Sequence, residues 1–120
     1  MDENIRDGWA AASIRVRAPD VRTLAIPQNL LNAGEINRSG KTVVFSFRAG
    51  EEVRLQELLD DAKRFVTTNL DVLAALQGCE IDLFLGWSPM SPQESLLIES
   101  GLVRDLGRIG AGVVFDTYSE

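Results

Sequence analysis

The chain has 120 residues, of which 45% are hydrophobic and 25% charged, with a formal net charge of −6 at pH 7. This composition is typical of one soluble globular domain, and no apolar run approaches the roughly 20 residues of a membrane-spanning helix. The absence of histidine and the single cysteine exclude Ser-His-Asp and Cys-His catalysis, a histidine pH switch and a structural zinc site.

The N-terminal segment Met1–Asp7 is acidic and polar, without the basic start and apolar stretch of a signal peptide. We therefore expect a cytoplasmic protein, in keeping with a lone cysteine, Cys79, that has no disulfide partner within the chain. Residues 1–120 are predicted to form one domain, with residues 1–10 as a flexible or edge-packing segment.

The first predicted strand covers residues 11–17, where Ile14 and Val16 alternate with polar side chains. A short helical segment is expected from Pro19 and is stopped by Pro27, because proline cannot continue a helix. Residues 28–40, with their asparagines and glycines, are predicted to be mostly irregular chain.

The segment Gly34–Thr42 nearly matches a phosphate-binding loop, G-x-x-x-x-G-K-[ST]. Counted back from Gly40, however, the first glycine position holds Glu35, whose carboxylate repels phosphate. A strand rather than a helix is predicted to follow Thr42, so the helix N-terminus that binds the anion is absent. We interpret the segment as a polar turn before a strand.

The middle of the chain predicts a second strand at residues 41–48 and a helix at residues 51–66, whose leucines recur at helical spacing. A break with a new cap at residues 67–71 introduces a shorter helix at 69–77. A third strand follows at residues 80–85.

The C-terminal part predicts partly irregular chain at 88–98, where Ser91–Glu94 fits a capping box that leaves a helix start open, and then a helix at 100–109 capped by Ser100. The glycines of Gly107-x-x-Gly110-x-Gly112 have the wrong order for a dinucleotide-binding loop, and Gly110 is expected to end the helix. The last strand is predicted at 113–118. The elements together indicate an α+β two-layer sandwich: one four-stranded, largely antiparallel or mixed sheet with helices packed on one face.

The tail Leu102–Tyr118 resembles the close of a bacterial family catalogued as domain of unknown function 4279, which ends in a leucine-rich helix, a glycine and an apolar strand finishing in Asp-x-Tyr. Here the glycine is Gly110 and the finish is Asp116-Thr-Tyr118. The order of elements over residues 11–118 fits as well, whereas Ser100-Gly-Leu102 departs from the family's usual Ser-Pro-Glu. The resemblance implies a compact α+β domain and no established activity.

Asp116 and Tyr118 share one face of the last predicted strand. A carboxylate and a phenol are able to move protons. The alternative, which we favour, is structural: Asp116 pairs with Arg15 or Arg17 if the first and last strands are neighbours, and Glu80 and Asp82 do the same from the third strand.

Two further features suit a protein interface. Trp87, expected just after the third strand, is either an interface anchor or a lid on the edge of the core. Glu57, Asp60 and Asp61 project from the long helix, either as a solvated face or as an acidic patch for a basic partner.

Charge is unevenly spread. Residues 1–48 carry seven basic and five acidic side chains, and residues 49–120 carry five basic and thirteen acidic ones. This balance disfavours nucleic acid and suits a basic protein reached by electrostatic steering.

The first hypothesis is therefore a non-enzymatic protein-binding domain, with no cofactor and no membrane contact. Its most concrete form is an immunity-type inhibitor that neutralises a basic bacterial toxin such as a nuclease. The alternative is a homo-oligomeric structural or small-ligand-binding domain, in which an edge strand pairs across a two-fold axis. An enzyme that uses Asp116 and Tyr118 ranks third.

Overall fold

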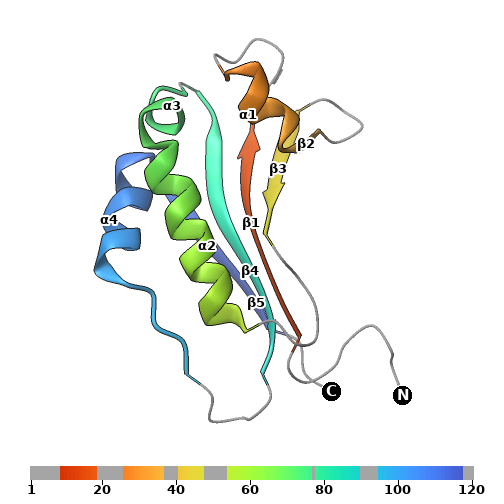
Figure 1. Ribbon diagram of the computed structural model, residues 1–120, viewed down its shortest axis with the longest axis vertical. Coiled ribbons are helices and arrows are strands. Elements are labelled where there is room, and N and C mark those ends of the chain that lie inside the picture. Colours follow the sequence, from red (N-terminus) through yellow and green to blue (C-terminus); the bar gives the residue numbers. More distant parts are fainter. Residues whose placement is uncertain are drawn as a thin grey trace.

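The computed structural model describes residues 9–18, 26–36, 41–47, 54–76, 78–89 and 95–117. The described residues form an α+β fold in which helices pack against one mixed sheet, as predicted (Figure 1). In chain order its elements are β1 (Trp9–Arg17), α1 (Gln28–Asn32), β2 (Glu35–Ile36), β3 (Thr42–Ser46), α2 (Leu55–Thr68), α3 (Leu70–Ala74), β4 (Glu80–Ser88), α4 (Ser100–Arg108) and β5 (Ala111–Thr117).

The sheet has five strands in the order β2-β3-β1-β4-β5. The central strand, β1, is antiparallel to both β3 and β4, with Ile14 opposite Phe45 on one side and Leu83 on the other. β5 runs parallel to β4, because the chain crosses back through α4 before it enters β5. β5 forms one edge of the sheet, and β1 and β4 lie between it and β3.

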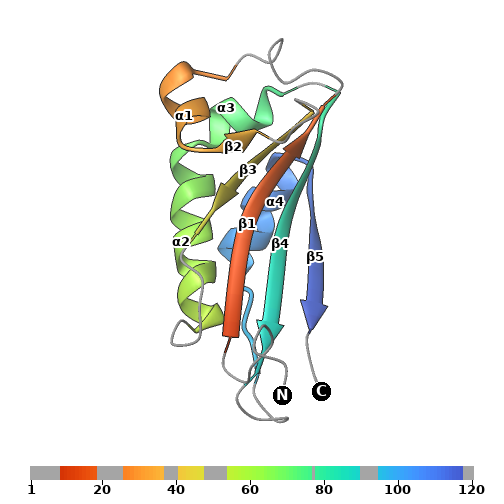
Figure 2. The same ribbon diagram turned by 90° about the vertical axis from the view of Figure 1, so that its right-hand side faces the viewer.

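The core lies between one face of the sheet and the helices α2 and α4, and no described helix covers the opposite face (Figure 2). Alternation along the strands explains this one-sided core, since every second side chain points to the same face. The buried apolar residues of the strands are mainly those predicted to point inward, together with two alanines of β1 and Trp87 of β4: Ala10, Ala12, Ile14, Val16, Val43, Phe45, Ile81, Leu83, Leu85 and Trp87.

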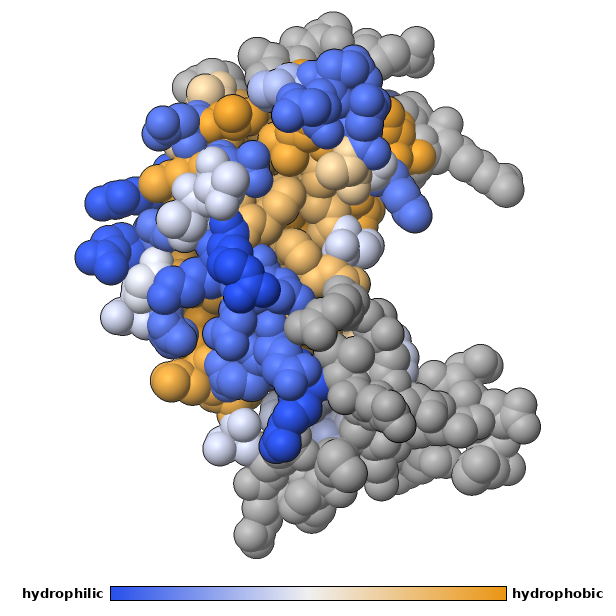
Figure 3. Space-filling model, in the orientation of Figure 1, coloured by the Kyte–Doolittle hydropathy of each residue, from blue (hydrophilic) through white to orange (hydrophobic). Residues whose placement is uncertain are grey.

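The long helix α2 buries the face predicted from its leucine spacing, namely Leu55, Leu58, Leu59, Ala62 and Val66. α2 begins at Leu55, with Arg54 in an extended conformation as its N-cap. The predicted start at residue 51 lies outside the described residues. Next to α2 an aromatic cluster joins the helix to the sheet: the Phe65 ring lies 5.1 Å from that of Phe45 and 5.7 Å from that of Phe47, measured between centroids. Figure 3 shows the apolar surface that gathers beside α2 toward α1, while α2 itself presents hydrophilic side chains.

Three predictions about the chain path were wrong. Residues 28–40 contain α1 and β2, so the sheet has a fifth strand. β4 extends through Trp87 to Ser88, because β1 is long enough to pair with it over its full length. Ser100 is the first residue of α4 and Glu99 is its N-cap, with no side-chain capping bond. By contrast Gly110, with φ of 70°, ends α4 as predicted. The helical segment from Pro19 and the capping box at Ser91–Glu94 lie outside the described residues.

Residues 95–99 form an extended segment that returns beside α2. Leu96 and Ile98 pack against the core, whereas Leu97 between them is 66% exposed. Side chains of an extended chain point to alternate sides, which explains why Leu96 and Ile98 are buried and Leu97 is not. Three consecutive apolar residues therefore fit an extended segment here, although they do not form one face of a helix. The prediction of irregular chain here is confirmed for the described residues.

Gly34 explains part of the segment that resembles a phosphate loop. A Cβ atom at this position would lie 2.7 Å from Cγ1 of Val43 and 2.9 Å from Cε1 of Phe45, closer than real Cβ atoms come to other atoms. The glycine therefore lets the chain between α1 and β2 lie directly on β3. Its role here is packing, not phosphate binding.

We expect Gly34→Ala to lower the free energy of unfolding by about 1–3 kcal/mol, the usual cost of overpacking a core. Gly107→Ala is a matched control, because a Cβ there meets nothing within 4 Å and Gly107 lies inside α4. The control should be stabilising by roughly 0.5–1 kcal/mol. Urea unfolding of both variants, and of Gly34→Ala combined with Val43→Ala, measures the effect. Because the added Cβ also meets the Phe45 ring, shortening Val43 should relieve the cost only in part. A Gly34→Ala variant as stable as the wild type would contradict the predicted clash.

Candidate functional site

β5 is a strand because Val113, Val114 and Phe115 have the branched and aromatic side chains that favour extended chain. Among the described strands it pairs with β4 alone, so its outer edge has no strand partner there. Sheet edges present unpaired N–H and C=O groups, and proteins usually protect them with lysine, proline or very short strands. β5 has seven residues, neither lysine nor proline, and one charged side chain, Asp116.

The apolar side chains of β5 are unusually exposed. Val113 is 46% exposed, Val114 36% and Phe115 44%. By the register with β4, Val113 and Phe115 lie on the face toward the helices, beside Leu83 and Leu85, while Val114 lies on the open face beside Phe84. Both faces of this edge are thus apolar and accessible within the described part of the chain. Such a patch marks an interaction site more often than scattered surface leucines do.

Trp87 lies on β4, the strand next to this edge. It is 9% exposed, and its ring stacks on Phe115 with centroids 5.9 Å apart and planes 21° apart. Of the two predicted roles, anchor or lid, the placement supports the lid. The exposed member of the pair is Phe115, which the sequence reading did not single out.

Asp116 lies on the open face of β5, with Gly86 as its register partner on β4. The predicted pairing with Arg15 or Arg17 is wrong, because β4 stands between β1 and β5. Tyr118 lies outside the described residues, so its predicted place beside Asp116 stays a prediction.

The arginines of β1 instead pair with β4, as the other predicted pairing had it. Nε of Arg15 lies 2.7 Å from Asp82 Oδ1, and a second nitrogen lies 3.1 Å from Oδ2, a two-pronged bond. The Arg15 guanidinium also lies 4.7 Å above the centre of the Phe84 ring. Arg17 and Glu80 form a more exposed pair at 3.1 Å. These bonds explain the basic first strand without any external anion.

The three carboxylates predicted on α2 do not form one free cluster. Asp61 pairs with Arg64 one turn along the helix, and its side chain is only 16% exposed. Glu57 and Asp60 are exposed and have no ion-pair partner among the described residues. Described residues of α2 thus offer two unpaired carboxylates rather than a dense acidic patch.

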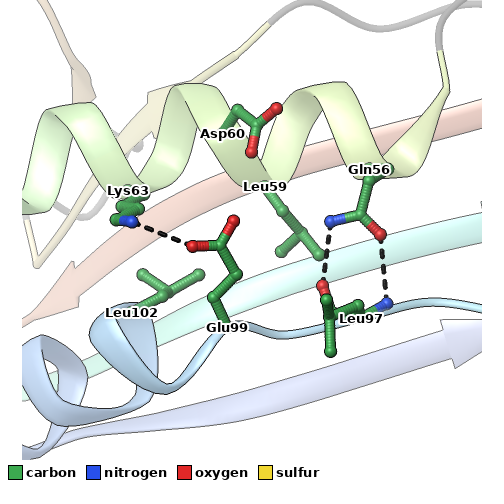
Figure 4. Close-up of a pocket in the computed structure, with 7 residues that line it drawn as sticks. All are labelled: Gln56, Leu59, Asp60, Lys63, Leu97, Glu99 and Leu102. Atoms are coloured by element: carbon green, nitrogen blue, oxygen red, sulfur yellow. Dashed lines mark hydrogen bonds and ion pairs between the residues drawn. The ribbon is translucent and has the colours of Figure 1, made fainter.

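One flank of α2 is instead a polar seam with the segment that follows residue 94 (Figure 4). The side-chain amide of Gln56 donates to the carbonyl of Leu97 at 2.9 Å and accepts from its N–H at 3.0 Å. Lys63 binds Glu99 at 2.9 Å, and Thr67 donates to Asp105 of α4 at 3.0 Å. The side-chain amide of Gln56 therefore satisfies the backbone N–H and C=O of Leu97, as a neighbouring strand would do. We name these three contacts the α2 seam.

A surface cavity of about 430 Å³ opens beside the α2 seam, lined by Asp60, Lys63, Arg64, Thr67, Thr68 and Glu99. Lys63 and Glu99 of this lining bind each other, Thr67 binds Asp105 of α4, and Arg64 binds Asp61 within α2. Most of the polar side chains around the cavity are thus engaged in contacts within the chain. Within the described chain, no group of three or more histidine, cysteine or acidic residues is arranged to hold a metal ion.

Cys79 precedes β4 and is partly buried. Desolvation by this burial raises the pKa of its thiol above the ordinary value, which keeps the thiol protonated at neutral pH. Since the thiolate is the reactive form, Cys79 is a poor nucleophile.

Comparison with known proteins gives no relative. No protein-family model matches the chain, and neither the curated proteins nor the solved structures contain a match. The resemblance of residues 102–118 to the domain of unknown function 4279 family therefore stays a prediction. No helix in the described ranges is long and apolar enough to cross a membrane.

Proposed function

We propose that this chain is a non-enzymatic protein-binding domain that binds its partner through β5. The observation that carries the proposal is the exposed apolar edge formed by Val113, Val114 and Phe115, which has no strand partner among the described residues. An added strand gains main-chain hydrogen bonds from such an edge, and the alternate side chains provide specificity. Phe115, backed by the rigid Trp87 ring, is the aromatic group best placed to contact a partner.

Two finer versions follow from the proposal. In the first, the partner is a basic toxin and the chain is its immunity-type inhibitor. The net charge of −6 supports this version, as do Glu57 and Asp60, whose carboxylates have no ion-pair partner in the described part of the chain, since opposite charge accelerates association. In the second, the domain is homo-oligomeric. The exposed apolar side chains of β5 support this second version. The ion pairs of α2 favour it as well, because most of the helix's described charges are paired within the chain.

The test uses immobilised chain as bait for lysate of the source cells and for free copies of itself, at low and high salt. Val114→Lys adds a charge to the binding edge at an exposed position, while Glu57→Ala with Asp60→Ala is the matched change on α2. We expect the β5 variant to lose at least tenfold in captured partner, and the α2 variant to lose less than threefold.

The reverse order, with loss only for the α2 variant and only at low salt, would move the site to α2 and favour a basic partner. If the β5 variant retains everything that the wild type captures, the proposal that β5 is the binding edge is wrong.

A further inference from the structure

We infer that the partner of β5 is a second copy of this chain, which adds its own β5 in antiparallel orientation about a two-fold axis at Val114. The inference rests on the proposed function, because it requires β5 to be a binding edge, and it names the partner. Four features of β5 carry it: its length, its side-chain pattern, its charge and its place in the fold.

The length and centre of β5 fix the register. Ala111–Thr117 has seven residues, so full overlap of two antiparallel copies makes the middle residue, Val114, its own partner. Val113 then lies opposite Phe115 of the second copy, and Gly112 opposite Asp116. Every large apolar side chain of the strand thereby meets another apolar side chain.

The side chains on each face also match. Directly opposite residues of antiparallel strands point to the same face, and a two-fold axis perpendicular to the sheet keeps the helices of both copies on one side. On the open face, the Val114 side chains of the two copies lie opposite each other, and each lies next to Phe84 of its own β4. On the other face, Val113 and Phe115 form two cross-strand contacts beside Trp87. Aromatic and branched pairs of this kind stabilise neighbouring strands.

Charge selects this register over its neighbours. Asp116 is the one charged residue in β5, and in the full overlap it faces glycine, about 14 Å along the strand from its counterpart, given about 3.4 Å per residue. A register centred at Asp116 would place two carboxylates opposite each other, and one centred at Phe115 would place Asp116 opposite Val114. The overall charge of −6 per copy opposes association, but at physiological salt only over about 8 Å.

The fold permits this pairing and limits the assembly to a dimer. α4 leads into β5 at its first residue, so antiparallel pairing sends the two α4 helices toward opposite ends of the joined strands. The pairing is isologous and uses both β5 edges. The other edge of the sheet is β2, which has two exposed residues, one of them Glu35, and offers little to a further copy.

The first test measures self-association by sedimentation velocity between about 1 and 500 µM, because interfaces below about 1,200 Å² are often weak. We expect the wild type to form a reversible dimer. Val114→Lys and Val114→Glu should each remain monomeric, with dimerisation weakened at least tenfold, since like charges then lie opposite each other. A mixture of the two variants should recover the dimer, because each lysine then meets a glutamate. Circular dichroism of each variant alone establishes that it is folded.

The second test fixes the register with disulfides in a Cys79→Ala background. Opposite residues of an antiparallel pair lie about 4.5–5.5 Å apart at Cα, within the range that a disulfide spans. Val114→Cys should therefore cross-link two copies on mild oxidation. Asp116→Cys, on the same face of the same strand, should not, and it serves as the matched control.

Three results would overturn the inference. A wild type that is monomeric at every concentration, a dimer that survives both charged variants, or cross-linking through position 116 but not 114 would each do so. The proposed function fails separately. If the wild type is monomeric but Val114→Lys still loses a captured protein, β5 remains a binding edge and only its partner is different.

Discussion

Replacing Trp87 with alanine is expected to lower the free energy of unfolding by about 3–5 kcal/mol, the usual cost of removing a buried aromatic ring. The ring is 9% exposed, belongs to the buried core and stacks on Phe115. Removing it leaves a cavity at the end of β4 that the surrounding strands cannot close. Thermal or urea unfolding, followed by circular dichroism, measures the loss.

Phe115→Ala is the matched control for Trp87. Phe115 is 44% exposed, so its removal should cost less than about 1.5 kcal/mol of stability while it weakens binding at β5. The two positions thus separate a core role from an interface role within one stacked pair. A Trp87→Ala protein with wild-type stability but impaired binding would show instead that Trp87 is the anchor.

Phe45→Ala is expected to have a stability effect of similar size, about 3–5 kcal/mol. Phe45 is 2% exposed, and its ring connects β3 to α2 through Phe65 while it also supports the chain at Gly34. Loss of the ring therefore weakens three elements at once. Urea unfolding of the wild type and of Phe45→Ala measures this difference in the free energy of unfolding.

Phe47 provides the comparison for Phe45. It contacts the same Phe65 ring edge-on, but it lies just beyond β3 and is only partly buried. Phe47→Ala should accordingly cost clearly less than Phe45→Ala. Equal losses at the two positions would mean that the aromatic cluster acts as one unit, with β3 contributing little by itself.

The buried face of the sheet was predictable because it depends on local alternation alone. Ile14 and Val16 in β1, and Leu83 in β4, occupy the inward positions that a period of two requires. The inward face of α2 was predictable for the same reason, at a period of 3.6. Each of these patterns repeats every two to four residues, so a short stretch of sequence is enough to identify it.

The order of the strands was not predictable, because it depends on contacts between distant segments. Arg15 has equally plausible carboxylate partners on β4 and β5, and only the position of β4 next to β1 selects Asp82. The extended path of residues 95–99 likewise depends on Gln56, 41 residues before Leu97, which supplies the hydrogen bonds of a missing strand.

The candidate site was partly visible in the sequence. Val113, Val114 and Phe115 are consecutive, which fits a strand buried on both faces as well as a strand exposed on both. Only its place at the edge of the sheet shows that β5 is exposed. Two predicted site residues, Asp116 in β5 and Trp87 in the adjacent β4, do lie at this end of the sheet, but Phe115 and Val114 present the accessible surface.

The most direct test of β5 as a binding edge is hydrogen exchange at residues 111–117, resolved by NMR, at low and high protein concentration. Successive backbone N–H groups in a strand point to alternate sides, so every second amide of β5 faces the outer edge. We predict that these amides gain protection as the concentration rises, while the amides of the central strand β1 do not change. Outward amides of β5 that exchange equally fast at both concentrations would contradict pairing of this edge with a second copy.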